Sequence, residues 1–148
     1  GKFMEVISPV HGKITYDENE IIKFEKTILG FDKSKRFILK DVNENDFFKI
    51  LQSVDEPEVG FIVISPFEVE NNYEINLNNE VINTLKIKEA NNVLLYSLVT
   101  LNSKIEDITV NLKAPIVINI NNKKAQQFII DKEKYKIKHP LVKEWYKC

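Results

Sequence analysis

The chain has 148 residues, of which 43% are hydrophobic and 29% are charged, and this composition is typical of a globular protein of about one domain. We therefore treat residues 1–148 as a single β domain, with residues 1–3 as a possible tag remnant ahead of Met4. Cys148 is the only cysteine, which excludes a disulfide within the chain and favours the reducing cytoplasm. No apolar run approaches the roughly 18 residues of a membrane helix, and no signal-peptide hydrophobic region is present.

The net charge of −1 is unevenly distributed along the chain. Residues 121–148 carry eight basic and three acidic side chains, and Tyr135, Trp145 and Tyr146 interrupt the lysines of residues 132–147. A basic strip with aromatic residues is one signature of nucleic-acid binding, although the pI near 6.2 is low for a dedicated nucleic-acid-binding protein. We therefore expect a solvated lysine face and no direct nucleic-acid contact, and keep a nucleic-acid-binding β-barrel as the alternative.

Most of the chain has the pattern of β-strands. Residues 11–16 and 21–24 are predicted to pair as a hairpin around a turn at residues 17–20. Further strands are predicted where Val, Ile, Phe, Leu and Tyr are dense or alternate with polar residues: at residues 36–40, 47–54, 61–65, 93–101, 108–113, 116–120 and 127–130. The alternation in the last part of the chain predicts a buried face made of Val110, Leu112, Ile116 and Ile118.

One segment departs from the strand pattern. From residue 79, Val81, Ile82 and Leu85 fall on one face at helical spacing, so residues 79–89 are predicted to form a short amphipathic helix. Many short strands in one domain favour a closed or doubled sheet, because both arrangements hide exposed strand edges. The predicted fold is therefore all-β and mainly antiparallel, barrel-like or sandwiched, with one short helix.

The residues that usually carry catalysis or metal binding are sparse. His11 and His139 lie at opposite ends of the chain, and no cysteine pair accompanies them, so a zinc site is not expected. No Gly-x-Ser-x-Gly motif is present, and the four glycines are never clustered, so nucleophile elbows and phosphate-binding loops are excluded. We therefore predict no enzyme, no cofactor and no metal, expect a protein-binding module, and keep a small hydrolase that depends on His11 and His139 as the least favoured alternative.

Several phrases, read in order, resemble the FliW family of flagellar assembly factors. His11-Gly12 precedes a strand and is followed by IKFEK at residues 22–26 and LGF at residues 29–31. The further matching phrases are FKILQSV at residues 48–54, GFIVISPF at residues 60–67, LKAPIVIN at residues 112–119 and HPL at residues 139–141. The resemblance implies a cytoplasmic, non-enzymatic protein, monomeric when free, that binds flagellin and also binds and antagonises CsrA, an RNA-binding repressor of flagellin translation.

Physical arguments and motif position give candidate partner-binding residues. Gln52, Ser65 and Asn119 are polar residues inside apolar strands, where they either contact a partner or are satisfied within a strand pair. Phe67 is either an exposed anchor or a core aromatic residue. The remaining candidates come from a strand expected to begin near a sheet edge after a proline, and from the basic tail, which would meet acidic groups: Pro115, Ile118 and Lys138.

Overall fold

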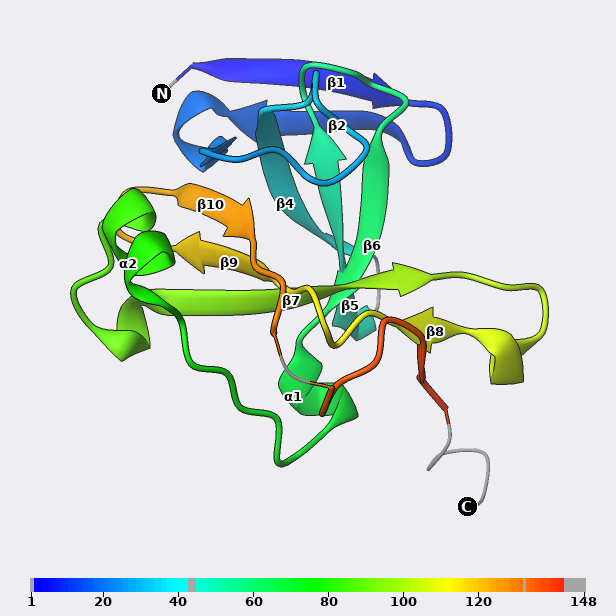
Figure 1. Ribbon diagram of the computed structural model, residues 1–148. Helices are drawn as coiled ribbons and strands as arrows, with labels where there is room; N and C mark the ends of the chain where they lie inside the picture. The colour runs from blue at the N-terminus through cyan, green and yellow to red at the C-terminus, as the bar shows by residue number, and fades with distance from the viewer. Residues whose placement is uncertain (1, 43–44, 132, 143–148) are drawn as a thin grey trace.

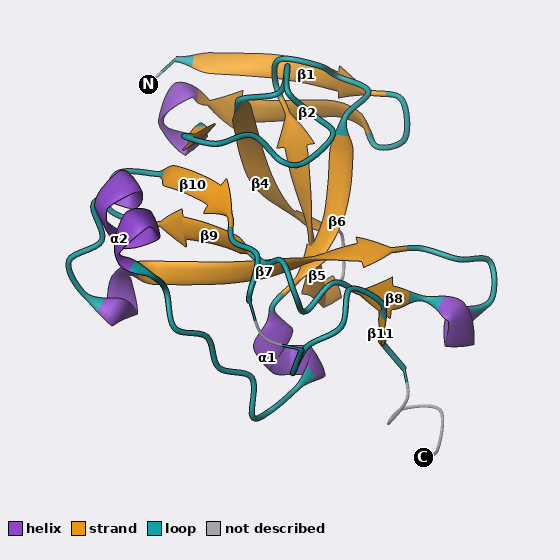
Figure 2. Cartoon of the chain, viewed as in Figure 1, coloured by secondary structure: helices purple, strands orange, loops and turns teal. Residues whose placement is uncertain are grey.

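The computed structural model describes residues 2–42, 45–131 and 133–142 (Figure 1). Strands dominate this part of the chain, and two short α-helices, α1 (Pro66–Val69) and α2 (Asn79–Leu85), lie on the outside of the sheet (Figure 2). The strands are β1 (Phe3–Ser8), β2 (Gly12–Asp17), β3 (Ile22–Phe24), β4 (Arg36–Val42), β5 (Asn45–Ser53), β6 (Gly60–Ile64), β7 (Val93–Thr100), β8 (Thr109–Val110), β9 (Ile116–Asn119), β10 (Lys124–Gln127) and β11 (His139–Pro140).

Seven of these strands form a closed barrel. The hydrogen-bonded order runs β7-β6-β5-β4-β3-β10-β9, and β9 pairs back onto β7, which closes the ring. All of these pairings are antiparallel except that of β3 with β10, where Lys23 lies opposite Lys124. Strands β8 and β11 extend the sheet beyond the barrel from β7. The all-β, mainly antiparallel, barrel-like prediction is confirmed.

The interior of the barrel is filled by aromatic and branched side chains. Phe37 is completely buried and contacts Phe24, with ring centroids 4.9 Å apart. Phe61 lies 6.3 Å from Phe37 and 4.9 Å from Phe31, where the rings meet edge to face. Because side chains alternate across each strand, every second residue points into this core.

Helix α2 and irregular chain cover part of the barrel's outer surface. Val81 and Leu85 of α2 pack against Val117 of β9, so β9 is buried on both faces. A second outer core lies beside β7 and β8 and contains Val110 and Leu112. The four residues predicted to be buried, Val110, Leu112, Ile116 and Ile118, are confirmed, with exposed fractions of 0–3%.

The predicted N-terminal hairpin is wrong in its pairing. Strand β2 pairs with β1, with Tyr16 opposite Met4, whereas β3 pairs with β4 and β10 inside the barrel. Between them a 3-10 turn at Glu18–Glu20 carries a capping box with Asp17, which directs the chain from the hairpin into the barrel. Phe3, among the residues set aside as a possible tag remnant, begins β1, and the hairpin lies across one end of the barrel (Figure 1).

Several other boundaries differ from the sequence prediction. The strand predicted at residues 108–113 is limited to Thr109–Val110, because Asn111 Oδ1 accepts hydrogen bonds from the backbone N–H groups of Lys113 and Ala114 and starts a turn. The strand predicted at residues 127–130 instead covers Lys124–Gln127. Strand β9 is hydrogen-bonded on both sides, so it does not begin at a sheet edge as expected.

The helical prediction also needs correction. Helix α2 begins at the predicted residue, capped by Asn78 Oδ1, which accepts from Val81 N at 2.9 Å. It ends four residues early, because Lys86 adopts a left-handed conformation with φ of 55°. Helix α1, a single turn that begins at Pro66, was not predicted.

Candidate docking surfaces on the outside of the barrel

A groove of about 580 Å³ lies outside the barrel, between α1, the chain that joins α1 to α2, and β7. We call it the apolar groove, and its hydrophobic lining consists of Phe67, Tyr73, Ile75, Leu77, Ile82, Ile87, Ala90, Val93 and Leu95. Phe67 is 49% exposed, a large fraction for a phenylalanine in a packed protein. A partly exposed aromatic side chain beside half-buried aliphatic residues is a surface that another protein can cover.

Two buried tyrosines hold the chain between α1 and α2 in place. The Tyr73 hydroxyl donates to the carbonyl oxygen of Leu112 at 2.8 Å, and the Tyr135 hydroxyl accepts from Glu74 N at 2.9 Å. The two rings are in contact, with centroids 4.5 Å apart, and Phe67 meets Tyr73 edge to face. Burial raises the pKa of Tyr73 well above its usual range, which is consistent with a protonated hydroxyl that donates to a buried carbonyl group.

The far wall of the apolar groove depends on how α2 ends. The last carbonyl groups of a helix lack partners within the helix. Asn119 Nδ2 donates to the carbonyl oxygens of Leu85 at 2.8 Å and Lys86 at 3.2 Å, and Asn122 Nδ2 donates to that of Leu85 at 3.0 Å. The turn between β9 and β10 therefore fixes the C-terminal end of α2 against the barrel.

A second surface, rich in basic side chains, adjoins the start of β4. Two recesses of about 580 and 570 Å³ share Lys23 and Arg36 in their linings. Lys33 and Lys35 line the first recess, and Lys123 lines the second together with Lys2 near the N-terminus. We call the five side chains of Lys23, Lys33, Lys35, Arg36 and Lys123 the basic groove. Its acidic lining residues are Glu18, Asp32 and Asp55.

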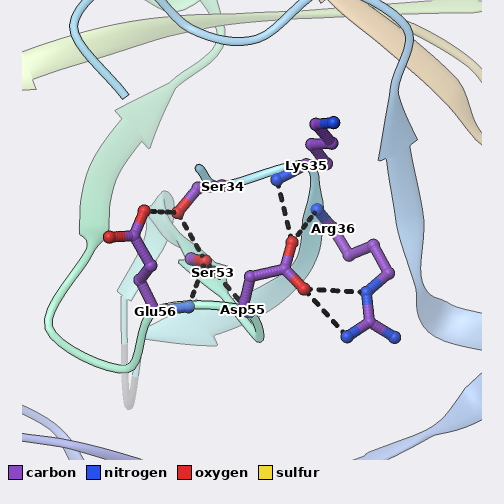
Figure 3. Close-up of polar contacts among 6 residues, drawn as sticks. All are labelled: Ser34, Lys35, Arg36, Ser53, Asp55 and Glu56. Carbon is purple, nitrogen blue, oxygen red and sulfur yellow. Dashed lines mark hydrogen bonds and ion pairs between the residues drawn. The ribbon is translucent and has the colours of Figure 1, made fainter. Parts of the chain in front are cut away.

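A polar network holds the first recess of the basic groove (Figure 3). Asp55 Oδ2 accepts from the backbone N–H groups of Lys35 and Arg36, each at 2.9 Å, while Oδ1 accepts from the Arg36 guanidinium. Burial raises the pKa of Asp55, but these hydrogen bonds and the Arg36 charge outweigh it and hold that pKa below its ordinary value. Beside it, buried Ser34 is hydrogen-bonded to Ser53 and to Glu56 (Figure 3).

Four of the predicted partner-binding residues are buried. Gln52 is 1% exposed, and its Nε2 donates to the carbonyl oxygens of Ser53, Pro57 and Val59. Asn119 is 2% exposed and holds α2, as described above. Ile118 lies inside the barrel and Pro115 is buried beside β9, where its carbonyl oxygen accepts from Phe128 N.

The other three predicted residues reach the surface. Ser65 is half-buried at the start of α1, Phe67 lies in the apolar groove and Lys138 is exposed. The structure places Ser65 and Phe67 together at α1, whereas Lys138 lies just before β11. Of the tail aromatics, Trp145 and Tyr146 lie outside the described residues, and Tyr135 is buried in the outer core.

Sequence reasoning missed the basic groove. Lys33, Lys35 and Arg36 are close in sequence, so this part carried a visible signal. Lys23 and Lys123 join them only because β3 and β10 pair, which places residues about a hundred positions apart side by side.

Over residues 2–42, 45–131 and 133–142, no group of three or more His, Cys, Asp or Glu side chains is arranged to hold a metal ion. Within those same ranges, no helix is long and apolar enough to cross a membrane.

The closed barrel and its two outer grooves define a class of small β-barrel protein with candidate docking surfaces on its outside. The family model described as FliW protein matches residues 5–141. The chain therefore belongs to the FliW family.

Individual relatives agree with this assignment. The chain is 50% identical over 141 residues to a protein of Clostridium beijerinckii named flagellar assembly factor FliW, covering 95% of this chain and 100% of that protein. A protein of the same name from Clostridium novyi is 49% identical over 141 residues, covering 95% of this chain and 99% of that protein. A crystal structure described as that of the flagellar assembly factor FliW superimposes with a TM-score of 0.87 at 38% identity, covering 93% of this chain and 96% of that one. These names describe an assembly role, and no catalytic family is indicated.

Proposed function

We propose that this protein is a non-enzymatic flagellar assembly factor that works in the cytoplasm by exchanging partners. In this proposal it binds monomeric flagellin, and when flagellin has been exported it binds CsrA and relieves the repression of flagellin translation. The FliW family membership and the assembly-factor names of its relatives support the proposal. We expect bound flagellin to lower the affinity for CsrA, and bound CsrA to lower the affinity for flagellin by the same factor, because antagonism between two ligands of one protein is reciprocal.

The observation that carries the proposal is the apolar groove, and we assign flagellin to it. Its aliphatic lining and exposed Phe67 match the way in which proteins receive the apolar face of an amphipathic helix. The terminal helical segments of monomeric flagellin are ligands of this kind. Of the predicted partner-binding residues, we propose direct contact for Phe67, and a supporting role for Asn119, which fixes α2 beside the groove.

The test is calorimetric titration of the protein with monomeric flagellin from its own organism, followed by titration with flagellin that lacks its terminal helical segments. We expect binding to the intact monomer and loss of binding after truncation. Addition of CsrA to the flagellin complex should then lower the apparent affinity for flagellin. Absence of binding to intact monomeric flagellin would contradict the proposal.

A paired substitution locates the contact. The double variant Phe67→Ala and Ile75→Ala removes two apolar side chains of the groove and should weaken flagellin binding by about tenfold or more, as expected for central apolar contacts. The matched control is Leu101→Ala and Ile129→Ala, which shortens two side chains with exposed fractions of 62% and 60% that do not line the groove. Equal weakening in both double variants would place the flagellin contact elsewhere.

A further inference from the structure

The basic groove combines cations from three separate parts of the chain. Lys23 comes from β3, Lys33 and Lys35 from the chain before β4, Arg36 from the first residue of β4, and Lys123 from the turn between β9 and β10. All five are exposed. The parallel pairing of β3 with β10 brings the first and last of them together, since Lys23 N donates to the carbonyl oxygen of Lys123 at 2.9 Å.

Four of the five cations form no direct ion pair with the rest of the described chain. Arg36 is paired with Asp55, but Lys23, Lys33, Lys35 and Lys123 take part in none of the ion pairs formed among residues 2–42, 45–131 and 133–142. Some lysines on other parts of the described surface, such as Lys40 and Lys124, are paired with carboxylates, whereas others, such as Lys104, take part in none of these ion pairs. The basic groove is therefore a local excess of cations on a chain whose net charge is −1.

The backbone that carries these cations is held firmly. Asp55 fixes the N–H groups of Lys35 and Arg36 (Figure 3). Lys123 has a φ of 58°, and its N–H donates to the carbonyl oxygen of Asn119 at 2.8 Å in a tight turn. Fixed attachment points reduce the ordering that a ligand must impose when it binds.

We propose that the basic groove is a second docking surface and that it binds an acidic polypeptide segment of a protein partner. Charge complementarity is the argument for this occupant, because several unpaired ammonium groups along two adjoining recesses favour several carboxylates along one chain. Single-stranded nucleic acid is the less suitable ligand. Among the described residues that line the two recesses, the only aromatic one is Phe24, which is 6% exposed and offers little surface on which a base could stack.

The inference does not depend on the flagellin proposal. The linings of the basic groove and the apolar groove share no residue. Substitutions in one surface therefore leave the side chains of the other in place, and the failure of either proposal is distinguishable from the failure of the other.

The test measures fluorescence anisotropy of a labelled peptide of alternating glutamate and glycine, titrated with the full chain at low and at physiological salt. We expect binding that weakens as salt screens the charges. The double variant Lys23→Glu and Lys33→Glu should bind about tenfold more weakly, because two attractive charges become repulsive. The matched control, Lys104→Glu and Lys136→Glu, changes net charge equally at exposed lysines outside the groove and should bind like the parent chain.

Three results would overturn the inference. The first is absence of peptide binding at low salt. The second is equal weakening in the two double variants, which would mean that the peptide responds to net charge alone. The third is tighter binding of a labelled oligouridine than of the peptide, with loss in the Lys23→Glu and Lys33→Glu variant only, which would make the surface a nucleic-acid site. Melting curves establish that each variant is folded.

Discussion

The interior of the barrel and the layer outside it are built in different ways. Around the interior, each of the seven strands is hydrogen-bonded to a neighbour on both sides, and Phe37 and its aromatic neighbours fill the space between them. Outside the barrel, the chain from α1 to the start of β7 contains two short α-helices and a 3-10 turn at Ala90–Asn92, and side chains hold it in place. Tyr73, Tyr135, Asn119 and Asn122 supply these hydrogen bonds.

The difference indicates which part of the molecule opens at the lower free-energy cost. A closed sheet opens only if several backbone ladders break together, whereas a segment held by a few side chains opens at a lower free-energy cost. The apolar groove is lined largely by that outer segment, and the barrel supplies the fixed wall through Val93 and Leu95 of β7. Substitutions in the two regions should therefore have effects of different size and extent.

The largest effect is expected inside the barrel. Phe37→Ala removes a completely buried ring that contacts Phe24, and it should lower the free energy of unfolding by about 3–5 kcal/mol. Urea denaturation of the whole chain measures this loss. The control, Ile129→Ala, shortens a side chain that is 60% exposed and should change stability by about 0.5 kcal/mol or less. Similar losses of unfolding free energy in the two variants would show that packing inside the barrel is not the main source of stability.

An intermediate effect is expected in the outer layer. Tyr73→Phe keeps the ring but leaves the buried carbonyl oxygen of Leu112 without its donor, at a cost of about 1–3 kcal/mol. Hydrogen exchange should show faster exchange of the chain between α1 and α2, with little change in the strands of the barrel. A matched control is Tyr16→Phe, which removes a hydroxyl from a buried tyrosine that packs with Val6 and Ile38, away from the chain between α1 and α2. Faster exchange throughout the barrel after Tyr73→Phe would show that the two regions open as one unit.

The smallest effect is expected at the edge of the barrel and depends on pH. The pKa of Asp55 lies below its ordinary value of 3.8 in the folded protein, so its carboxylate stabilises the fold above that pH. The contribution is lost as the pH falls from about 3.8 through the lower pKa of the folded state. Asp55→Asn should therefore reduce the melting temperature at neutral pH and reduce the further decrease on acidification.

The control for this pH series is Asp32→Asn, which removes an exposed carboxylate from the same groove and leaves every bond of Figure 3 in place. It should retain the melting profile of the parent chain. If Asp55→Asn retained that profile as well, the Asp55 network would be irrelevant to stability.

The sequence predicted the barrel strands best where hydrophobic residues are dense. Strands β5, β6 and β7 were found for this reason, and α2 was found because helical spacing places Val81 and Leu85 on one face. Strand β10 was misplaced because it contains Gln126, a polar residue that is only 4% exposed in the folded chain. Its burial comes from the tertiary packing of the barrel, which local polarity does not reveal.

The candidate site was less accessible to sequence reasoning. The sequence leaves two roles open for polar residues in apolar strands, contact with a partner or hydrogen bonding within the fold, and Gln52 and Asn119 donate to carbonyl groups of their own chain. The Gln52 side chain even restricts its neighbour, because a Cβ atom at Gly60 would lie 2.8 Å from Gln52 Oε1. Such roles depend on how loops and strands meet in the folded chain, and the residues next to Gln52 or Asn119 in the sequence do not reveal this.

The turn between β9 and β10 touches both docking surfaces. Asn122 lines the basic groove, and its side-chain amide also holds the last turn of α2, from which Ile82 lines the apolar groove. A ligand in one groove and a ligand in the other would therefore bear on the same few residues without overlapping. Under the proposed exchange of partners, occupation of both grooves at once would form a transient ternary complex, and the rate of exchange would then no longer be set by spontaneous release alone.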